Sequence, residues 1–244
     1  MSQKTALIIG GSGGIGTAII KRLLKDGFLV CGAYYKNVDK VENLRQELAG
    51  QPVFFYKTDL LDQSAIQATM QEVVAEHKQI DVLVFSATLP LEHKQLLDCE
   101  WEDFEKDLQV QLRGMFYAFK SLQAQIKQKR ETKFIILLSA VCVGKPPSRM
   151  GSYTVAKYGL MGLAKIMAVE LAQYNCTVNM LSPGMVQTDL IKSFPTKLVE
   201  IAAQKNSKQQ LIQPEEVAER VSELVLAPAG YFNGKNIGIN GEEV

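Results

Sequence analysis

A tyrosine and a lysine near the middle of the chain have the types and the spacing needed to move a proton. Tyr153 and Lys157 lie four residues apart in the stretch "SYTVAKYGL". In a helix this spacing places both side chains on one face. An ammonium beside a phenol lowers the pKa of the phenol, because a positive charge favours the ionised form. The pair is therefore a candidate proton donor to a carbonyl oxygen, although an ordinary surface pair would show the same spacing.

A tyrosine that protonates a carbonyl oxygen usually works with a second hydrogen-bond donor aimed at that oxygen. Ser139, in the stretch "LLSAVCVGK", is the candidate for this second donor. A hydroxyl at the end of a strand could equally bond to the local backbone, so the sequence leaves both roles for Ser139 open. Cys142 is a poor substitute because an S–H group donates only weakly.

A glycine-rich loop near the start of the chain predicts a nucleotide site. The sequence "GGSGGIG" joins the first apolar run to the first amphipathic segment. Glycines let the backbone approach a pyrophosphate, and the free amides at the start of a helix face its negative charge. A tight turn would also favour glycine, but the position after a first strand favours dinucleotide binding. The candidate contacts are Gly10, Ser12, Gly13, Gly14, Ile15 and Gly16.

The end of the second predicted strand indicates which dinucleotide is bound. A free ribose 2′-hydroxyl favours a carboxylate there, whereas a 2′-phosphate favours a cation. The chain reads "AYYKN", which contains a lysine and no carboxylate. Tyr35 can pack against the adenine or ribose, and Lys36 can pair with a phosphate. This pattern favours NADPH, with the alternative that Lys36 is an ordinary surface residue.

The elements that must position these residues alternate along the chain. Alternating strands and helices predict an α/β protein: a Rossmann-type, doubly wound parallel sheet of about seven strands with helices on both faces. We expect one domain over 1–244. Residues 189–212 break the alternation and are predicted to form a mobile substrate flap. The predicted strands are 5–9, 28–33, 53–56, 82–85, 134–138, 177–181 and 235–239, and the main helices are 14–26, 38–49, 62–77, 100–128, 152–173 and a segment from 214.

Composition excludes several other classes of protein. A net charge of +1 over 244 residues argues against a nucleic-acid or anionic-membrane footprint. Four cysteines without metal-ligand spacing and only two histidines argue against a metal site. We find no signal peptide and no apolar run long enough for a membrane span. The cysteines are expected to be reduced and buried, as suits a cytoplasmic protein.

Five motifs together resemble the short-chain dehydrogenase/reductase family, and most of all its β-ketoacyl (3-oxoacyl) carrier-protein reductases. They are the spaced glycines of the first loop, "TDL" at 58–60, "YTVAK" at 153–157, "LSPGMVQTD" at 181–189 and "NGKNIGINGE" at 233–242. The resemblance covers essentially the whole chain. It implies that Tyr153 donates the proton and that Lys157 holds the cofactor ribose and lowers the tyrosine pKa. The other cofactor contacts that it implies are Asp59, Leu60, Ala87, Pro183, Gly184, Val186 and Thr188.

Several positions depart from the family pattern. Ile9 replaces the usual threonine before the glycine loop, and "FSAT" at 85–88 replaces the usual N-N-A-G, of which only Ala87 remains. Gln111 stands where the family has an asparagine that supports a water path to the lysine. The usual serine, thirteen residues before the tyrosine, falls on Ala140, with Ser139 just before it.

These departures leave two functions open. The first is an NADPH-dependent reductase of a ketone, plausibly a 3-oxoacyl group on a carrier-protein or CoA thioester, with Tyr153, Lys157, Ser139 and Gln111 as catalytic residues. The second is a catalytically impaired member that serves as the structural partner of an active paralogue. The resemblance also implies a homo-tetramer, or a hetero-oligomer with that paralogue, built through the helices at 100–128 and 152–173. Four flap lysines could meet an acidic carrier protein or could be ordinary solvated charges: Lys192, Lys197, Lys205 and Lys208.

Overall fold

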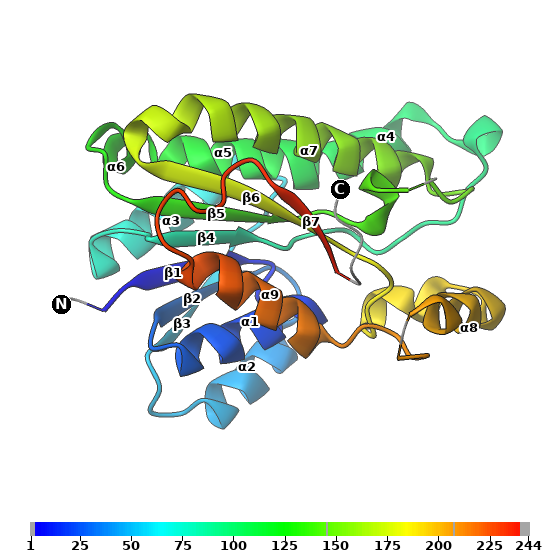
Figure 1. Cartoon of the computed structure of the whole chain (residues 1–244), viewed down its shortest axis with the longest axis horizontal. Helices are drawn as coiled ribbons and strands as arrows, with labels where there is room; N and C mark the ends of the chain where they lie inside the picture. The colour runs from blue at the N-terminus through cyan, green and yellow to red at the C-terminus, as the bar shows by residue number, and fades with distance from the viewer. Residues whose placement is uncertain (1–2, 145, 207, 240–244) are drawn as a thin grey trace.

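The computed structural model of the protein describes residues 3–144, 146–206 and 208–239. In this part of the chain, a seven-stranded parallel sheet has the strand order β3-β2-β1-β4-β5-β6-β7. Helices cover both of its faces (Figure 1). The predicted α/β, doubly wound class is thus confirmed. The strands are β1 (Thr5–Ile9), β2 (Leu29–Tyr34), β3 (Val53–Lys57), β4 (Val82–Phe85), β5 (Thr132–Leu137), β6 (Cys176–Pro183) and β7 (Asn236–Ile239).

The strand order places a topological switch point at the carboxyl ends of β1 and β4. The chain runs outward from β1 to β3 and then crosses to β4, which pairs with the other side of β1. The connections after β1 and β4 therefore leave in opposite directions, and ligands of open parallel sheets bind at such a switch point. The glycine loop follows β1, and the segment 86–95 follows β4, so both lie at this point.

Two hydrophobic layers hold the helices against the sheet. Leu7 and Ile9 of β1 face one layer, whereas Ala6 and Ile8 face the other, as the alternation of a strand requires. The first layer packs against α3 (Gln63–His77), α5 (Gly114–Ser121), α6 (Gln123–Lys127) and α7 (Gly151–Leu171). The second packs against α1 (Gly14–Lys25), α2 (Val38–Glu47) and α9 (Pro214–Leu226).

The segment predicted as one helix over 100–128 is divided in the structure. It consists of α4 (Trp101–Leu108), a π-helical turn η2 (Gln109–Arg113), α5 and α6. A π-turn closes its hydrogen bonds one residue later than an α-helix does, so it accommodates an extra residue and rotates its side chains. Gln111, within this turn, is fully buried. Such turns occur frequently at functional sites, and this one holds a predicted site residue.

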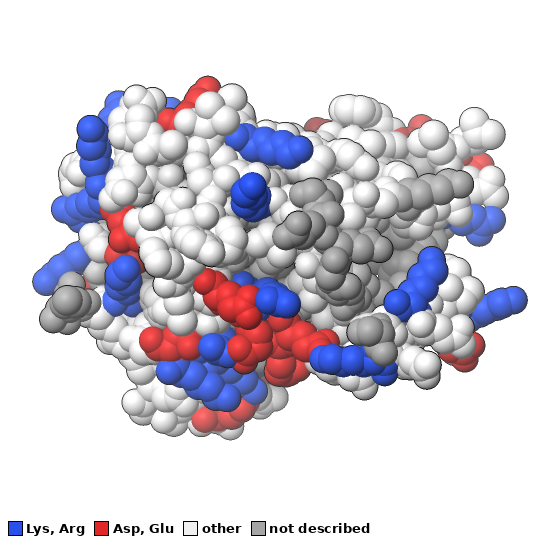
Figure 2. Space-filling view, in the orientation of Figure 1, with Lys and Arg blue, Asp and Glu red and all other residues white. Residues whose placement is uncertain are grey.

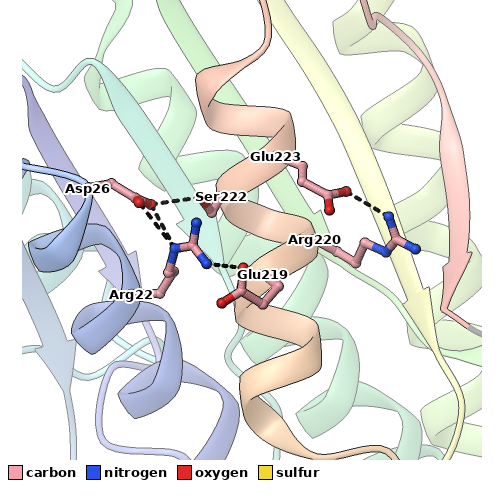
Figure 3. A network of polar contacts seen from close by, with 6 residues as sticks. All are labelled: Arg22, Asp26, Glu219, Arg220, Ser222 and Glu223. Carbon is pink, nitrogen blue, oxygen red and sulfur yellow. Dashed lines mark hydrogen bonds and ion pairs between the residues drawn. The ribbon is translucent and has the colours of Figure 1, made fainter.

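A polar network joins the first and last helices on the second face of the sheet (Figure 3). Arg22 of α1 contacts both Asp26, at 3.1 Å, and Glu219 of α9. The hydroxyl of Ser222 on α9 donates to Asp26 at 2.7 Å. Acidic and basic side chains intermingle over the surface of these helices (Figure 2). The network fastens α9 to α1 on this face of the sheet.

The predicted flap is helical and lies beyond the carboxyl ends of the strands (Figure 1). It contains the short helix η5 (Asp189–Ser193) and α8 (Thr196–Lys205), while residue 207 lies outside the described part of the chain. An isolated bridge joins Val186 to Ile212, so the two ends of the segment meet. The mobility of the flap stays a prediction.

Within residues 3–144, 146–206 and 208–239, no helix combines the length and apolar character needed to cross a bilayer. The same residues contain no group of three or more His, Cys, Asp or Glu arranged to hold a metal ion. The cysteines are unpaired, and Cys31, Cys142 and Cys176 are buried as expected, whereas Cys99 is only partly buried, so the expectation of burial is wrong for that residue. Residues 1–2 and 240–242, which the predicted domain and the last family motif include, lie outside the described residues, as do 243–244.

Candidate active site

Helix α7 brings Tyr153 and Lys157 to the carboxyl end of β5. Both side chains are buried, with 8% and 3% of their surfaces exposed. The Lys157 ammonium donates a hydrogen bond to the carbonyl oxygen of Leu137 at 2.8 Å, where β5 ends. Its nitrogen lies 5.6 Å from the centre of the Tyr153 ring. The predicted shared face is therefore present, and it points into the fold rather than into solvent.

The predicted lowering of the Tyr153 pKa by Lys157 is wrong in this structure. Burial raises the pKa of Tyr153 to about 12. Burial also lowers the pKa of Lys157, to about 8. Burial is the largest cause of both shifts, and the Lys157 ammonium donates its hydrogen bond to the carbonyl oxygen of Leu137. Near neutral pH, Tyr153 consequently keeps its proton and Lys157 is mostly charged, which suits a proton donor and its supporting cation.

The structure places Ser139, and not Ala140, beside Tyr153. Ser139 follows β5 in an extended conformation, and its hydroxyl lies near enough to the Tyr153 side chain to offset part of the rise in the pKa of that phenol. The same hydroxyl accepts a long bond of 3.5 Å from the amide of Val141. Ala140 is exposed and begins the short helix η3 (Ala140–Cys142). The connection from this serine to Tyr153 is thus one residue longer than the thirteen-residue spacing implied by the resemblance.

Gln111 and Asp107 form a second polar group close to this pair. The Gln111 amide donates to Asp107 Oδ1 at 3.1 Å, and the hydroxyl of Ser152, next to Tyr153, donates to Asp107 Oδ2 at 2.7 Å. Burial raises the pKa of Asp107, while Ser152, Gln111 and Lys157 act in the opposite direction. Sequence reasoning missed Asp107. Its spacing of four residues before Gln111 is the only signal that could have found it.

The glycine loop has the geometry of a phosphate cradle. Gly10 has a φ of +92°, and a Cβ there would lie 2.8 Å from the backbone nitrogen of Ala87. A Cβ on Gly16 would lie only 2.2 Å from the carbonyl oxygen of Gly10. Helix α1 begins at Gly14 with Gly13 as its N-cap, without a side-chain capping bond and without an acidic residue in its first turn. Its first amides therefore remain suited to an anion.

The other residues of the loop belong to its walls. Asn37, at the start of α2, donates to the Ser12 hydroxyl at 3.4 Å. Ile15 is partly buried and packs against the second hydrophobic layer. Ala87 is also partly buried and touches Gly10 from the end of β4. The retained alanine of "FSAT" therefore lies directly against the glycine loop.

The chain after β6 closes the other side of the loop. Pro183 ends β6, and Val186 is buried beneath the flap. Gly184 follows Pro183, and Thr188 follows Val186 by two residues. A Cβ on Gly14 would lie 2.7 Å from Thr188 Cγ2. The predicted nicotinamide segment and the predicted pyrophosphate loop are therefore in contact, although they are far apart in the sequence.

The residues predicted to bind the adenosine end also gather in one place. Tyr35 and Lys36 follow β2, and the Lys36 nitrogen lies 5.2 Å from the centre of the Tyr35 ring. A hydrogen bond to Asp59, just after β3, raises the pKa of Tyr35. Leu60 lies next to Gly114. A Cβ added to Gly114 would lie 3.5 Å from the Cβ of Leu60, which is an ordinary van der Waals distance. An aromatic ring, a cation and a carboxylate thus lie together beyond the carboxyl ends of β2 and β3.

Comparison with known proteins identifies the family. A family model described as enoyl-(acyl carrier protein) reductase matches residues 10–241. The chain belongs to the short-chain dehydrogenase/reductase family. The resemblance drawn from the sequence motifs is thereby confirmed.

Named relatives of this short-chain dehydrogenase/reductase match over nearly their full length. It is 29% identical to the 3-oxoacyl-[acyl-carrier-protein] reductase FabG of Staphylococcus aureus (strain Mu50 / ATCC 700699), over 98% of this chain and 97% of that protein. It is 30% identical to the FabG protein of Buchnera aphidicola subsp. Acyrthosiphon pisum (strain APS), over 99% and 97%. A solved short-chain dehydrogenase/reductase from Serratia marcescens BCRC 10948 has a TM-score of 0.88 and 28% identity, over 98% of this chain and 96% of that one.

Proposed function

We propose that the protein is an NADPH-dependent reductase that converts a ketone to the hydroxy compound, with Tyr153 as proton donor. The observation that carries this proposal is the placement of the Ser139 hydroxyl near the Tyr153 phenol, whose pKa it lowers, together with the buried Lys157. It supplies the second donor that the serine-to-alanine change at position 140 puts in doubt. Two hydroxyls side by side can both reach a single carbonyl oxygen, as this reduction requires.

The residues around the switch point fit a phosphorylated dinucleotide. The uncapped start of α1 suits the pyrophosphate, and Lys36 suits a 2′-phosphate. Asp59 and Leu60 would contact the adenine, and Pro183, Gly184, Val186 and Thr188 would flank the nicotinamide. When bound, the reduced nicotinamide would supply a hydride to the carbonyl carbon.

The chain's own residues would then handle the proton. Tyr153 keeps its proton at neutral pH because burial holds its pKa at about 12. It gives that proton to the substrate oxygen as negative charge develops there, while Ser139 donates a hydrogen bond to the same oxygen. Lys157 supplies a nearby positive charge and would hold the cofactor ribose.

The substrate class that we propose is a 3-oxoacyl group on a carrier-protein or CoA thioester. The support is the activity named for the two FabG relatives, which match over nearly the whole chain. The flap lysines add less than the sequence predicted. Lys192 pairs with Asp189 at 2.6 Å, and Lys208 pairs with Glu216. Two of the four lysines are therefore already neutralised within the chain.

We also propose that the protein assembles at least into a dimer through α7, and by family resemblance into a tetramer. Val155, Tyr158, Ile166 and Val169 repeat at helical spacing along α7 and are 41% to 74% exposed. A second copy of the same apolar stripe would cover these side chains in a two-fold contact.

The test is an NADPH-oxidation assay with a short 3-oxoacyl thioester, run on the protein and on Tyr153→Phe. We expect activity in the first and a loss of about 10² or more in the second, because no other group can replace the phenol proton. NADPH binding without turnover would instead identify a structural partner of an active paralogue. The buried Gln111 and the altered "FSAT" segment are the features that would then explain inactivity.

A further inference from the structure

A half-buried carboxylate, Asp107, connects two of the proposed catalytic residues. It belongs to the last turn of α4, directly before the π-turn that carries Gln111. One carboxylate oxygen accepts a hydrogen bond from the Gln111 amide at 3.1 Å. The other accepts from Ser152, the residue before Tyr153, at 2.7 Å. Asp107 thus ties the π-turn to the first turn of α7.

The bond from Gln111 to Asp107 determines how the buried amide is oriented. Gln111 is 0% exposed, and its nitrogen is directed at the carboxylate. Its oxygen, Oε1, is buried and has no hydrogen-bond partner within the part of the chain that the structure describes. A buried acceptor of this kind is unfavourable unless a donor reaches it. Asp107 therefore keeps Gln111 Oε1 available as a hydrogen-bond acceptor in the interior, because rotation of the amide would place this oxygen against the Asp107 carboxylate oxygen.

Asp107 also influences the charge of Lys157. Its negative charge opposes the burial of the ammonium and raises the pKa of Lys157, as does Cys142. Burial raises the pKa of the Cys142 thiol, so near neutral pH this neighbour is uncharged and Asp107 is the anion that remains. Lys157 and Glu92 are the charged groups that act on Asp107 in return.

We propose that Asp107 is a positioning residue for the reduction, which holds the Gln111 amide in one orientation and keeps the buried Lys157 protonated. The effect on turnover rests on the proposed function, whereas the effect on Lys157 does not. Together, Asp107 and Gln111 do in this chain what the family resemblance assigns to one asparagine. A purely structural alternative is that Asp107 only fastens Ser152 at the start of α7.

The two views differ in what happens to the lysine when the charge is removed. Asp107→Asn keeps the size of the side chain but removes its charge. Glu105→Gln is the matched control, because Glu105 lies on the same helix and accepts from Gln109 at the same spacing, at 2.8 Å, on the exposed side. Protein labelled with ¹³C-lysine reports the Lys157 side chain by NMR, assigned with Lys157→Met. This titration needs neither substrate nor cofactor.

We expect the Lys157 midpoint, near pH 8 in the unaltered protein, to fall by about 0.5 to 1 unit in Asp107→Asn, less than a direct ion pair would give. It should stay unchanged in Glu105→Gln. If the protein is a reductase, kcat should fall about 10-fold or more with little change in KM, and the decline of the rate at high pH should begin at a lower pH.

An unchanged Lys157 midpoint in Asp107→Asn would overturn the proposal and leave Asp107 as a fastening for Ser152. Thermal unfolding of each variant checks that it is folded, and Asp107→Ala gives the same comparison if the asparagine variant is not. An unaltered protein without reductase activity would contradict the proposed function alone, because the NMR comparison would still decide the role of Asp107.

Discussion

Ser139→Ala is the substitution that tests the site most directly. Ser139 is the hydroxyl that lies near Tyr153 and lowers its pKa, whereas the neighbouring Ala140 is exposed. Loss of one donor to a developing oxyanion typically lowers kcat by about 10² to 10³, or roughly 2.7 to 4 kcal/mol. KM should change little, because the bond matters most when charge develops on the substrate oxygen.

The effect on stability should be much smaller than the effect on rate. Within the protein, the bond that Ser139 accepts from Val141 is long, at 3.5 Å. Its loss should cost no more than about 0.5 to 1.5 kcal/mol of unfolding free energy. The Ser139 hydroxyl also lowers the pKa of Tyr153, so the variant should keep its phenol even more firmly protonated. The loss of rate should therefore persist at all pH values below about 8.

The double variant Ser139→Ala/Ala140→Ser supplies the control. It moves the hydroxyl to the position that family spacing implies, but there the side chain faces solvent. Turnover of NADPH and a 3-oxoacyl thioester should therefore remain as low as in Ser139→Ala. A single variant within threefold of the unaltered rate, or recovery in the double variant, would refute the placement of Ser139.

Three further predictions concern the cradle, the buried lysine and the α7 surface. Gly16→Ala should lower the unfolding free energy by about 1 to 3 kcal/mol or more, because its Cβ would lie 2.2 Å from the carbonyl oxygen of Gly10. Gly13→Ala is the control: its Cβ would lie 3.4 Å from the same oxygen, so the unfolding free energy should change by less than about 1 kcal/mol. Thermal or urea unfolding measures both. Lys157 has a folded pKa of about 8, below its ordinary value of 10.5, so the unfolded chain binds more protons between these pH values and stability should rise with pH there. Urea titrations should show this rise, amounting to about 3 kcal/mol, relative to Lys157→Met, and parallel curves would contradict it. Val169→Glu, at a site 74% exposed, should shift the protein towards monomer in sedimentation at micromolar concentration, and a monomeric unaltered protein would contradict the proposed assembly.

Much of the fold could be predicted because its signals are local. Apolar runs of four to eight residues marked the strands within one or two residues, as for Val82–Phe85, which matches β4. Apolar runs do not predict the order of the strands in the sheet, because that order depends on how distant segments pack. The division of the helix at 100–128 was also missed, since a π-turn is a matter of backbone hydrogen bonds and carries no distinct composition.

The candidate active site could likewise be predicted only in part from the sequence. The glycine loop and the Tyr153–Lys157 pair could be found from spacing alone, since one turn or one helix fixes their geometry. The direction of the Tyr153 pKa could not, because it depends on how far the group is removed from water. Asp107 was missed for a related reason: its partners come from two helices, and nothing near it in the sequence shows that it faces inward.

The bridge between Val186 and Ile212 has a consequence for how the protein could diversify. The segment between these residues leaves the body and returns to it at one point, so its length and composition can change while the strands stay where they are. Under the proposed function, exchange of residues 189–211 alone, which keeps Thr188 against the glycine loop and keeps the bridge itself, should alter which acyl chains are accepted. A change of substrate would then need no change in the sheet or in the loop that follows its first strand.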